Sequence, residues 1–368
     1  MKSIKAYLQQ NSKQFVTNVP KEQTFVSNNF QQIGDIFVID AMNLFIRNFS
    51  ISTILDKRAN HIGGLVGSLN SIYSIIRKFR PKRIIVVFEG DNSTLYRKKI
   101  YKEYKSQRKG KGVTNKAVFF NEDEAEESFN WQLLTFIQYL QNLPINLLSV
   151  EGYEADDVIG WLVTKSSLIC QNSTQTFETN SEQIPNKFVI ISSDGDYLQL
   201  VSNNVTVFSP TKKIMYTIDE VYKEFGIHSY NFLLYKTLIG DKSDNIAGVK
   251  GLQLKTLLKI FPNISNEEQI CLQDLLEFCN TKILDKKPYK IYGEIISSQD
   301  LIQLNEKLMD LCNVNIPKIL VNEIEENLSQ KFEPNLVECV VNSEKHYLSE
   351  HLFKSPQEFF NEFLYLNL

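Results

Sequence analysis

The sequence predicts an α/β fold, in which a mostly parallel central sheet is flanked by helices and followed by a smaller helical region. Between residues 35 and 209, short apolar runs rich in β-branched residues alternate with segments whose apolar residues recur at helical spacing. Such alternation is typical of a sheet whose parallel strands are joined by helices. After Thr217 the strand-like runs fade, and short helices with turn-rich connections follow.

The elements can be placed in order along the chain. Buried strands are predicted at 35–40, 83–88, 145–150 and 187–192, with a further one at 205–209. Helices are predicted at 65–79, where Arg80 and Pro81 end the helix, at 129–140 and at 155–165. The polar residues 171–186 are expected to form a surface loop, and the run KIYGEIISS at 290–298 is expected to form a strand.

Composition and charge exclude several classes of protein. The apolar runs among the 368 residues are too short to cross a bilayer, and the N-terminal MKSIKAYLQQNSKQF lacks the apolar segment of a signal peptide. Five cysteines without a C-x-x-C pair and only four histidines argue against zinc and for reduced thiols. A cytoplasmic protein is therefore expected. The net charge of −3 hides a basic stretch, 97–116, and an acidic one, 122–127.

Acidic side chains follow the predicted strands at their carboxyl ends, where an open parallel sheet usually binds its ligand. These residues are Asp40, Glu89, Asp91, Glu154, Asp156, Asp157, Asp194 and Asp196. Two such charges 4 Å apart repel by about 4 kcal/mol at an effective dielectric near 20, so the cluster requires protons or cations. Mg²⁺ prefers oxygen ligands, and two ions about 3.5–4 Å apart can hold a phosphate and activate a water. A single Asp after a strand is more often a helix cap, but four such strand ends in series favour a metal site.

The basic stretch interleaves cations with aromatic rings. The cations are Arg97, Lys98, Lys99, Lys102, Lys105, Arg108, Lys109 and Lys111, and the rings are Tyr96, Tyr101 and Tyr104. Cations hold phosphates and bases stack on aromatic faces, so an exposed segment that binds single-stranded nucleic acid is predicted. The alternative is a solvated helix face.

Five motifs resemble the flap endonuclease and 5′→3′ exonuclease family, particularly its bacterial and bacteriophage members, including the phage-type ribonuclease H. They are FVIDAMNLFIR, VVFEGDNSTLYRKKIYKEYKSQRKG, EGYEADDVIG, VIISSDGDYLQL and LIGDKSDNIAGVKGLQLKT, in the family's order from about residue 36 to 261. The resemblance implies a PIN-like nuclease core, a metal site that adds Asp241 and Asp244 to the carboxylates above, and a helical arch containing Tyr104, Lys105 and Arg108. Lys105, Arg108 and Arg97 would act on the phosphate.

The resemblance also implies a helix–hairpin–helix in which Gly248, Lys250, Gly251 and Lys255 bind the nucleic-acid backbone. Two positions depart from the family pattern. Glu89 stands where the family usually has Asp, although Asp91 could take this role if the register shifts. Gln253 stands where the hairpin usually has Gly, which puts its grip on a duplex in doubt.

Near the C-terminus, Gln357, Phe360, Phe363 and Leu364 resemble peptides that dock on sliding clamps. The same spacing is typical of an amphipathic helix packed on the core, and this second interpretation is favoured.

Together these observations predict a polar arm at 1–33 and a nuclease core at 34–216 that includes a basic arch at 92–120. They also predict a helix–hairpin–helix region at 217–262 and a C-terminal extension at 263–368. The expected function is a monomeric 5′→3′ exonuclease or flap endonuclease that uses two Mg²⁺, with Mn²⁺ as a substitute. It would act on DNA and RNA–DNA hybrids with a 5′ end or flap, removing primers or flaps during replication. A sliding clamp or a single-strand-binding protein is a possible partner. The alternative is a non-catalytic nucleic-acid-binding protein of the same fold.

Overall fold

The computed structural model describes residues 34–107, 112–169, 186–285, 288–330 and 332–366. Its centre is a six-stranded sheet in the order β3-β2-β1-β4-β5-β6. The strands are β1 (Ile36–Asp40), β2 (Arg83–Phe88), β3 (Asn146–Ser149), β4 (Phe188–Ile191), β5 (Val205–Ser209) and β6 (Ile214–Tyr216). All neighbours pair in parallel except β5 and β6. The mostly parallel α/β fold is therefore confirmed, with β6 as an edge strand that the sequence did not predict.

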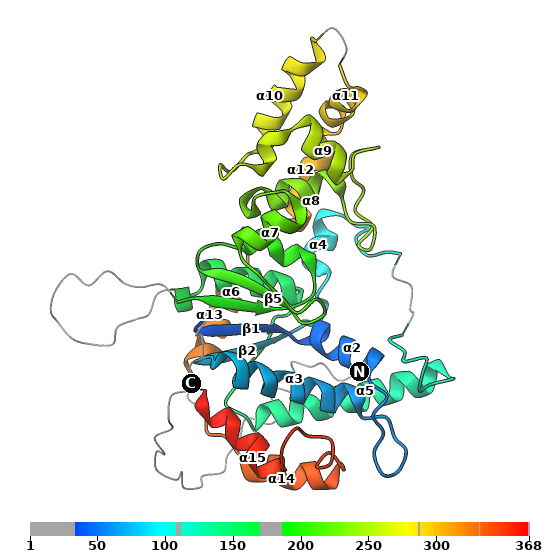
Figure 1. The fold of residues 1–368 in the computed structure, drawn as a ribbon, viewed down its shortest axis with the longest axis vertical. Helices are drawn as coiled ribbons and strands as arrows, with labels where there is room; N and C mark the ends of the chain where they lie inside the picture. The colour runs from blue at the N-terminus through cyan, green and yellow to red at the C-terminus, as the bar shows by residue number, and fades with distance from the viewer. Residues whose placement is uncertain (1–33, 108–111, 170–185, 286–287, 331, 367–368) are drawn as a thin grey trace, which may run out of the picture.

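One face of the sheet packs against helices in the lower half of Figure 1. They are α2 (Ala41–Ile51), α3 (Gly63–Phe79), α5 (Glu122–Gln141), α14 (Leu336–Lys345) and α15 (Pro356–Asn361). Because side chains alternate along a strand, Phe37 and Ile39 join this core together with Ile84 and Val86. The final turn, η5 (Glu362–Tyr365), extends α15 along the same layer.

The opposite face of the sheet is covered by α6 (Ala155–Lys165), α13 (Lys318–Ser329) and the 3₁₀ turn η2 (Gly195–Leu200). Val38 and Ile85 point into this second core, next to Leu162 of α6 and Ile324 of α13. A short turn, η1 (Ser167–Ile169), follows α6. Both faces of the sheet are thus buried, which explains why its strands are almost continuously apolar.

A helical lobe stands above the sheet in Figure 1. It contains α7 (Ile218–Phe225), η3 (Ser229–Asn231), α8 (Phe232–Ile239), α9 (Leu254–Ile260), η4 (Pro262–Ser265), α10 (Leu272–Ile283), α11 (Lys290–Ser297) and α12 (Gln299–Met309). Leu238, Leu257, Leu275 and Ile295 belong to its own apolar core. The segment after residue 262 therefore belongs to both parts of the molecule. Helices α10 to α12 complete the lobe, and helices α13 to α15 cover the sheet.

The structure corrects one predicted element. Residues 290–297 form the helix α11 rather than a strand. Tyr292 and Ile295 are buried in the lobe core, and their spacing places both on one helical face. Packing on this face outweighs the strand preference of the β-branched residues.

The C-terminal segment follows the favoured core-helix interpretation. Phe360 and Phe363 are fully buried, whereas Leu364 is 49% exposed. The predicted arm at 1–33 and residues 171–185 of the predicted loop lie outside the described residues. Within the described ranges, no helix is both long and apolar enough to span a membrane.

Candidate active site

The carboxyl end of β1, an inner strand, places Asp40 near the middle of the rim formed by the carboxyl ends of the strands. Asp40 caps α2, since its Oδ1 accepts a hydrogen bond from the Asn43 backbone N–H at 2.9 Å. Its Oδ2 accepts from Ser192 Oγ at 3.3 Å and from the Tyr197 hydroxyl at 3.2 Å. Ser192 directly follows β4, so these contacts aim Asp40 toward the end of the neighbouring strand.

Three carboxylates gather where α6 begins. Glu154, Asp156 and Asp157 each offer an oxygen, and these atoms all lie within 4.8 Å of one another. Glu154 and Asp157 also form a capping box, in which Asp157 Oδ2 accepts from the Glu154 N–H at 3.1 Å. Glu89 lies beside this group, and its Oε2 accepts from the Ala155 N–H at 3.3 Å. The N-terminus of α6 therefore has more carboxylates around it than helix capping requires.

A lysine joins the sheet rim to the helical lobe. Lys236 on α8 lies 2.7 Å from Asp196 Oδ1 and 3.3 Å from Asp241 Oδ2. Asp194 caps η2 by accepting from the Asp196 N–H at 3.0 Å. Ion pairing with one lysine therefore draws Asp241, from the connection after α8, toward the acids that follow β4.

Arg97, on the short helix α4 (Leu95–Ile100), lies inside the acidic cluster with only 3% of its surface exposed. Its guanidinium forms ion pairs with Glu154, with Asp156 at 2.9 Å and with Asp157 at 2.8 Å. Burial alone would lower the pKa of Arg97, but the charges of Asp156 and Asp157 raise it well above its ordinary value. Arg97 is thus a permanent internal counter-charge.

Tyr104 and Lys105 approach the same carboxylates. The Tyr104 hydroxyl donates to Glu154 at 2.7 Å and lies 3.2 Å from Asp244. Lys105 Nζ lies 2.5 Å from Glu154 Oε1 and 3.9 Å from Asp244 Oδ2. Asp244 therefore joins the cluster through the basic segment.

The turn containing Lys105 is fastened to the helical lobe. The Lys105 N–H donates to the Asp244 carbonyl at 3.0 Å, and Asn245 Nδ2 donates to the Glu103 carbonyl at 2.9 Å. Lys105 and Asn245 both have left-handed backbones, with φ of 54° and 61°. Asn adopts this conformation readily, but it is unfavourable for Lys and persists at Lys105 only where the surroundings enforce it.

The pKa values of several of the carboxylates are raised by burial and by one another's charges, which indicates that these groups lie in one site. Burial and the charges of Asp194 and Asp156 raise the pKa of Asp40 to about 6. Burial, with the charges of Glu154 and Asp156, raises the pKa of Glu89 to about 8. Asp40, Asp156 and Asp194 come from three separate strand ends, yet they lie within electrostatic reach of one another.

The neighbouring acids differ according to their cationic partners. Burial raises the pKa of Asp157 to about 7 and that of Asp196 to about 6, although Arg97 and Lys236 respectively oppose the rise. Burial also acts on Asp241, but hydrogen bonds from Ser243 and the charge of Lys236 leave its pKa below the ordinary value.

Comparison with known proteins identifies the family. Residues 35–226 match the model of the 5′-3′ exonuclease N-terminal resolvase-like domain. The 5′-3′ exonuclease of Aquifex aeolicus is 30% identical over 75% of this chain and 91% of its own length. The chain belongs to the 5′-3′ exonuclease family. Membership confirms the predicted family and the prediction of a nuclease, an enzyme that hydrolyses phosphodiester bonds.

Two further comparisons place this family member among related proteins. DNA polymerase I of Borreliella burgdorferi is 25% identical over 77% of the chain, which matches only 28% of the polymerase. The bacteriophage T5 flap endonuclease, in a pseudo-enzyme–product complex with DNA and metal ions, superposes with a TM-score of 0.60. It is 21% identical and covers 80% of this chain and all of its own. At that identity the structural likeness supports the fold.

The arch of this exonuclease family member departs from the predicted exposed segment. Base stacking was predicted for Tyr104. In the structure Tyr104 is 1% exposed and its hydroxyl is hydrogen-bonded to carboxylates, so the ring is not available to a base. Tyr96 packs against Tyr153 with ring centroids 5.2 Å apart. The buried carboxylates hold the Tyr104 hydroxyl inward, because a desolvated charge gains more from a hydrogen bond than an exposed one does.

The remaining arch residues divide by exposure. Lys98, Lys99 and Lys102 are exposed, as predicted for a strand guide. Arg108 lies outside the described residues. Glu89 lies within electrostatic reach of Glu154 and Asp156, and the Asp91 carbonyl accepts from the Gly152 N–H at 2.7 Å.

The predicted hairpin lies between α8 and α9. A Cβ on Gly248 would clash with the Ile239 carbonyl, and Gly251 has a φ of 78° with open space around it. Lys250 and Lys255 are exposed. Gln253, at the missing family glycine, has an ordinary extended backbone with φ of −137°, so the turn does not require glycine there.

Sequence reasoning missed the residues that orient the carboxylates. Ser192 and Tyr197 hold Asp40, and Lys236 holds Asp196 and Asp241. Tyr197 follows the acids in DGDYLQL, and Lys236 precedes Asp241 by five residues on an apolar helix. A polar residue on an otherwise apolar helix beside an acidic motif was the available signal.

Proposed function

We propose that the chain is a divalent-metal-dependent 5′ nuclease that hydrolyses DNA and RNA–DNA hybrids at 5′ ends and flaps, and that it removes primers or flaps during replication. The observation that carries this proposal is the convergence of carboxylates from separate strand ends with Lys105 and Arg97 among them. The names of its relatives, including exonucleases and a DNA polymerase, support the same role.

The donor set suits Mg²⁺, or Mn²⁺ in its place. The proposed ligands are all carboxylates, namely Asp40, Glu89, Glu154, Asp156, Asp157, Asp194, Asp196, Asp241 and Asp244. Oxygen donors are what these hard cations prefer. Burial, together with the neighbouring negative charges, raises the pKa values of Asp40 and Glu89, and bound cations would stabilise both carboxylates in their charged form. Two bound ions would polarise the phosphodiester and lower the pKa of the attacking water.

The chain's own residues would orient and neutralise the reacting phosphate. Lys105 keeps 15% of its side chain exposed at the edge of the cluster, so its ammonium can turn from Glu154 to an incoming phosphate. Arg97 is held more rigidly by three carboxylates and would add fixed positive charge behind them. Arg108 is proposed to act with Lys105.

Substrate contacts are proposed on two surfaces. Lys98, Lys99 and Lys102 on the arch would guide a single strand toward the acids, because exposed cations attract phosphates along an unpaired strand. Gly248, Lys250, Gly251 and Lys255 of the hairpin would contact the duplex. With 34–216 as the catalytic core and 217–262 as the duplex-binding region, one monomer would contact both parts of a flap. Burial of Phe360 and Phe363 gives no support to a clamp-docking role for the C-terminal segment.

The test uses 5′-labelled flap, nicked and RNA-primed substrates with Mg²⁺ or Mn²⁺. The proposal expects metal-dependent products from the 5′ end, and loss of at least about a hundredfold in rate when Asp156→Ala and Asp157→Ala are combined. Circular dichroism would establish that the variant is folded. Binding without turnover in Mn²⁺ would favour the non-catalytic alternative, and cleavage that the double substitution leaves unchanged would refute the proposed site.

A further inference from the structure

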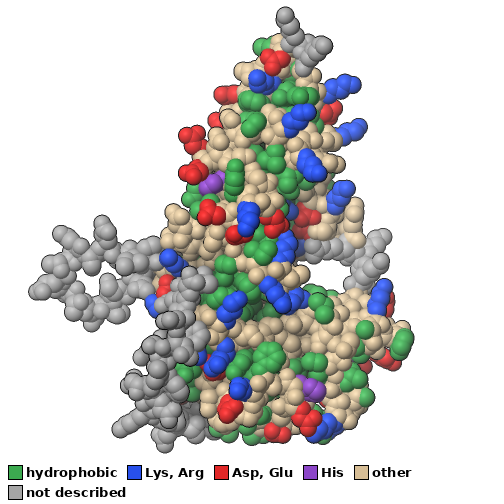
Figure 2. Space-filling view, in the orientation of Figure 1, with side chains coloured by type: hydrophobic (Ala, Val, Ile, Leu, Met, Phe, Trp, Pro, Cys, Tyr) green, Lys and Arg blue, Asp and Glu red, His purple; other side chains and the backbone are tan. Residues whose placement is uncertain are grey.

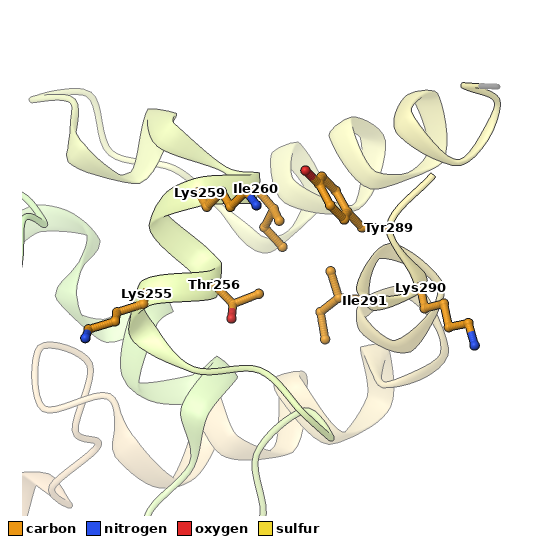
Figure 3. A pocket seen from close by; sticks show the side chains of 7 residues that line it. All are labelled: Lys255, Thr256, Lys259, Ile260, Tyr289, Lys290 and Ile291. Carbon is orange, nitrogen blue, oxygen red and sulfur yellow. The ribbon is translucent and has the colours of Figure 1, made fainter. Parts of the chain in front are cut away.

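A pocket of about 400 Å³ lies in the helical lobe between α9 and the start of α11 (Figure 3). Its lining residues are Lys255, Thr256, Lys259, Ile260, Tyr289, Lys290 and Ile291. Ile260 and Ile291 face each other across the pocket, while Lys255 and Lys290 lie at opposite ends with their ammonium groups directed outward. The pocket thus has an apolar floor with cations at both ends.

The lysines of this pocket carry uncompensated charge. Within the described ranges, Lys255, Lys259 and Lys290 have no carboxylate within ion-pair distance, whereas Lys212 and Lys223 pair with Glu224 and Glu220 respectively. Figure 2 shows Lys and Arg side chains along the right flank of the lobe and acidic ones along the left. Figure 1 places α9 and α11 on that right flank.

Tyr289 restrains one of these cations. Lys259 Nζ lies over the Tyr289 ring, 5.4 Å from its centroid, and Tyr289 is 51% exposed. Such a cation–π contact holds the ammonium without neutralising its charge. Lys259 therefore remains available to an anion that approaches the pocket.

We propose that this pocket binds the sugar–phosphate backbone of the duplex part of the substrate, beyond the hairpin contact. Lys255 and Lys259 lie four residues apart on α9, about one helical turn, which allows them to reach neighbouring phosphates of one strand. Sugars between the phosphates would lie over Ile260 and Ile291, and the Thr256 hydroxyl can donate to a phosphate oxygen. The pocket extends the predicted hairpin surface along the same helix.

This inference rests on the proposed function, and salt dependence tests it separately. The plot of log K against log salt has a negative slope. Removing one cation that binds a phosphate makes this slope less steep by about 0.9 and weakens binding roughly five- to tenfold near 0.1 M salt. Combining Lys259→Ala with Lys290→Ala is expected to make the slope less steep by between about 1 and 2 for a flap substrate with a long duplex. Binding of a single strand and kcat at saturating substrate are expected to stay unchanged.

The matched control combines Lys212→Ala with Lys223→Ala, which removes the same charge from paired lysines and is expected to leave the slope unchanged. Shortening the duplex stepwise should abolish the difference between wild type and the pocket variant once the duplex no longer reaches α11. Tyr289→Leu should weaken binding less, because it frees Lys259 without removing its charge.

Three outcomes would overturn the inference. The first is a pocket variant whose log K falls with log salt as steeply as that of wild type. The second is a pocket variant that binds single strands as much more weakly as it binds the flap substrate. The third is an equal loss of affinity for inorganic phosphate alone, which would indicate a small-anion site. In each case a wild-type protein that still cleaves flaps would leave the proposed function intact. A wild type that neither binds nor cleaves them would count against the proposed function instead.

Discussion

Arg97 neutralises three carboxylates in a nearly dry environment, so its removal should be costly. Leaving buried charges without their partner typically destabilises a fold by about 3–5 kcal/mol. Arg97→Met is therefore expected to lower Tm strongly in EDTA, and added Mg²⁺ should raise Tm more in the variant than in wild type, because cations would replace the missing charge. Thermal unfolding with and without Mg²⁺ measures both effects.

The matched control for Arg97 is Arg77→Met. Arg77 also pairs with a carboxylate, Glu362, but half of its side chain is exposed, so little change in Tm is expected. Equal Tm values for the Arg97 variant and wild type in EDTA would contradict the counter-charge role.

The raised pKa values of Asp40, Asp157, Asp196 and Glu89 predict a stability that depends on pH. Their folded pKa values of about 6 to 8 exceed their ordinary values, so between about pH 4 and pH 8 the folded state binds more protons than the unfolded state. The contribution of these groups to the free energy of unfolding is fully present below about pH 4 and is lost as pH rises from about 4 to 8. The metal-free protein should therefore become less stable through these groups as pH increases.

Asp40→Asn isolates one of these groups. The pKa of Asp40 rises from 3.8 to about 6, which at about 1.4 kcal/mol per pH unit amounts to on the order of 3 kcal/mol. In EDTA the stability of the variant should fall less than that of wild type between pH 4 and pH 6. Identical pH profiles from denaturant unfolding would count against protonation of Asp40 in the folded state.

At the scale of elements, the hairpin between α8 and α9 depends on Gly248 and not on position 253. Gly248→Ala would force a Cβ against the Ile239 carbonyl, so we expect destabilisation by about 1–3 kcal/mol and weaker duplex binding. Gln253→Gly should change stability by less than about 1 kcal/mol, because Gln253 is an exposed N-cap residue without a side-chain cap. Unfolding and duplex-binding measurements on both variants test this contrast, which equal effects would contradict.

Helix α15 is predicted to stabilise the core. Phe360 is fully buried and stacks on Tyr139 with centroids 5.8 Å apart, so Phe360→Ala should cost about 3–5 kcal/mol in the free energy of unfolding. Leu364→Ala, at a half-exposed position, should cost under about 1 kcal/mol. If both substitutions were silent in urea unfolding, the segment would not be part of the core.

These elements show where local sequence is sufficient. The parallel strands β1 to β5 were predictable because both faces of the sheet are buried and these runs are largely apolar, whereas the short edge strand β6 was not. The helix α11 was not, since Ile291 and Ile295 suit a strand until the partners that cover them are known. Likewise, the segment around Tyr104 is polar in sequence and predicts exposure, whereas in the fold Tyr104 is buried in one cluster with Ile246, Leu308 and Met309.

At the scale of the whole molecule, the site depends on contacts between segments far apart in sequence. The convergence of Asp40, Asp156 and Asp194 could be predicted, because parallel strands end at one rim. The approach of Arg97 to three acids and the bridge from Lys236 to Asp196 could not, since the first requires the arch and the second requires the lobe to be positioned over the sheet. Sequence patterns located the carboxylates, and tertiary packing determines their counter-charges.

The most direct test of the central claim is anomalous scattering from crystals soaked in Mn²⁺. The account predicts two Mn²⁺ peaks, about 3.5–4 Å apart, among the carboxylates that include Asp40, Asp156 and Asp194. It also predicts that Arg97 and Lys105 have moved relative to their metal-free positions or form fewer ion pairs. A protein that cleaves flaps in Mn²⁺ but shows no Mn²⁺ peak among these residues would contradict the account.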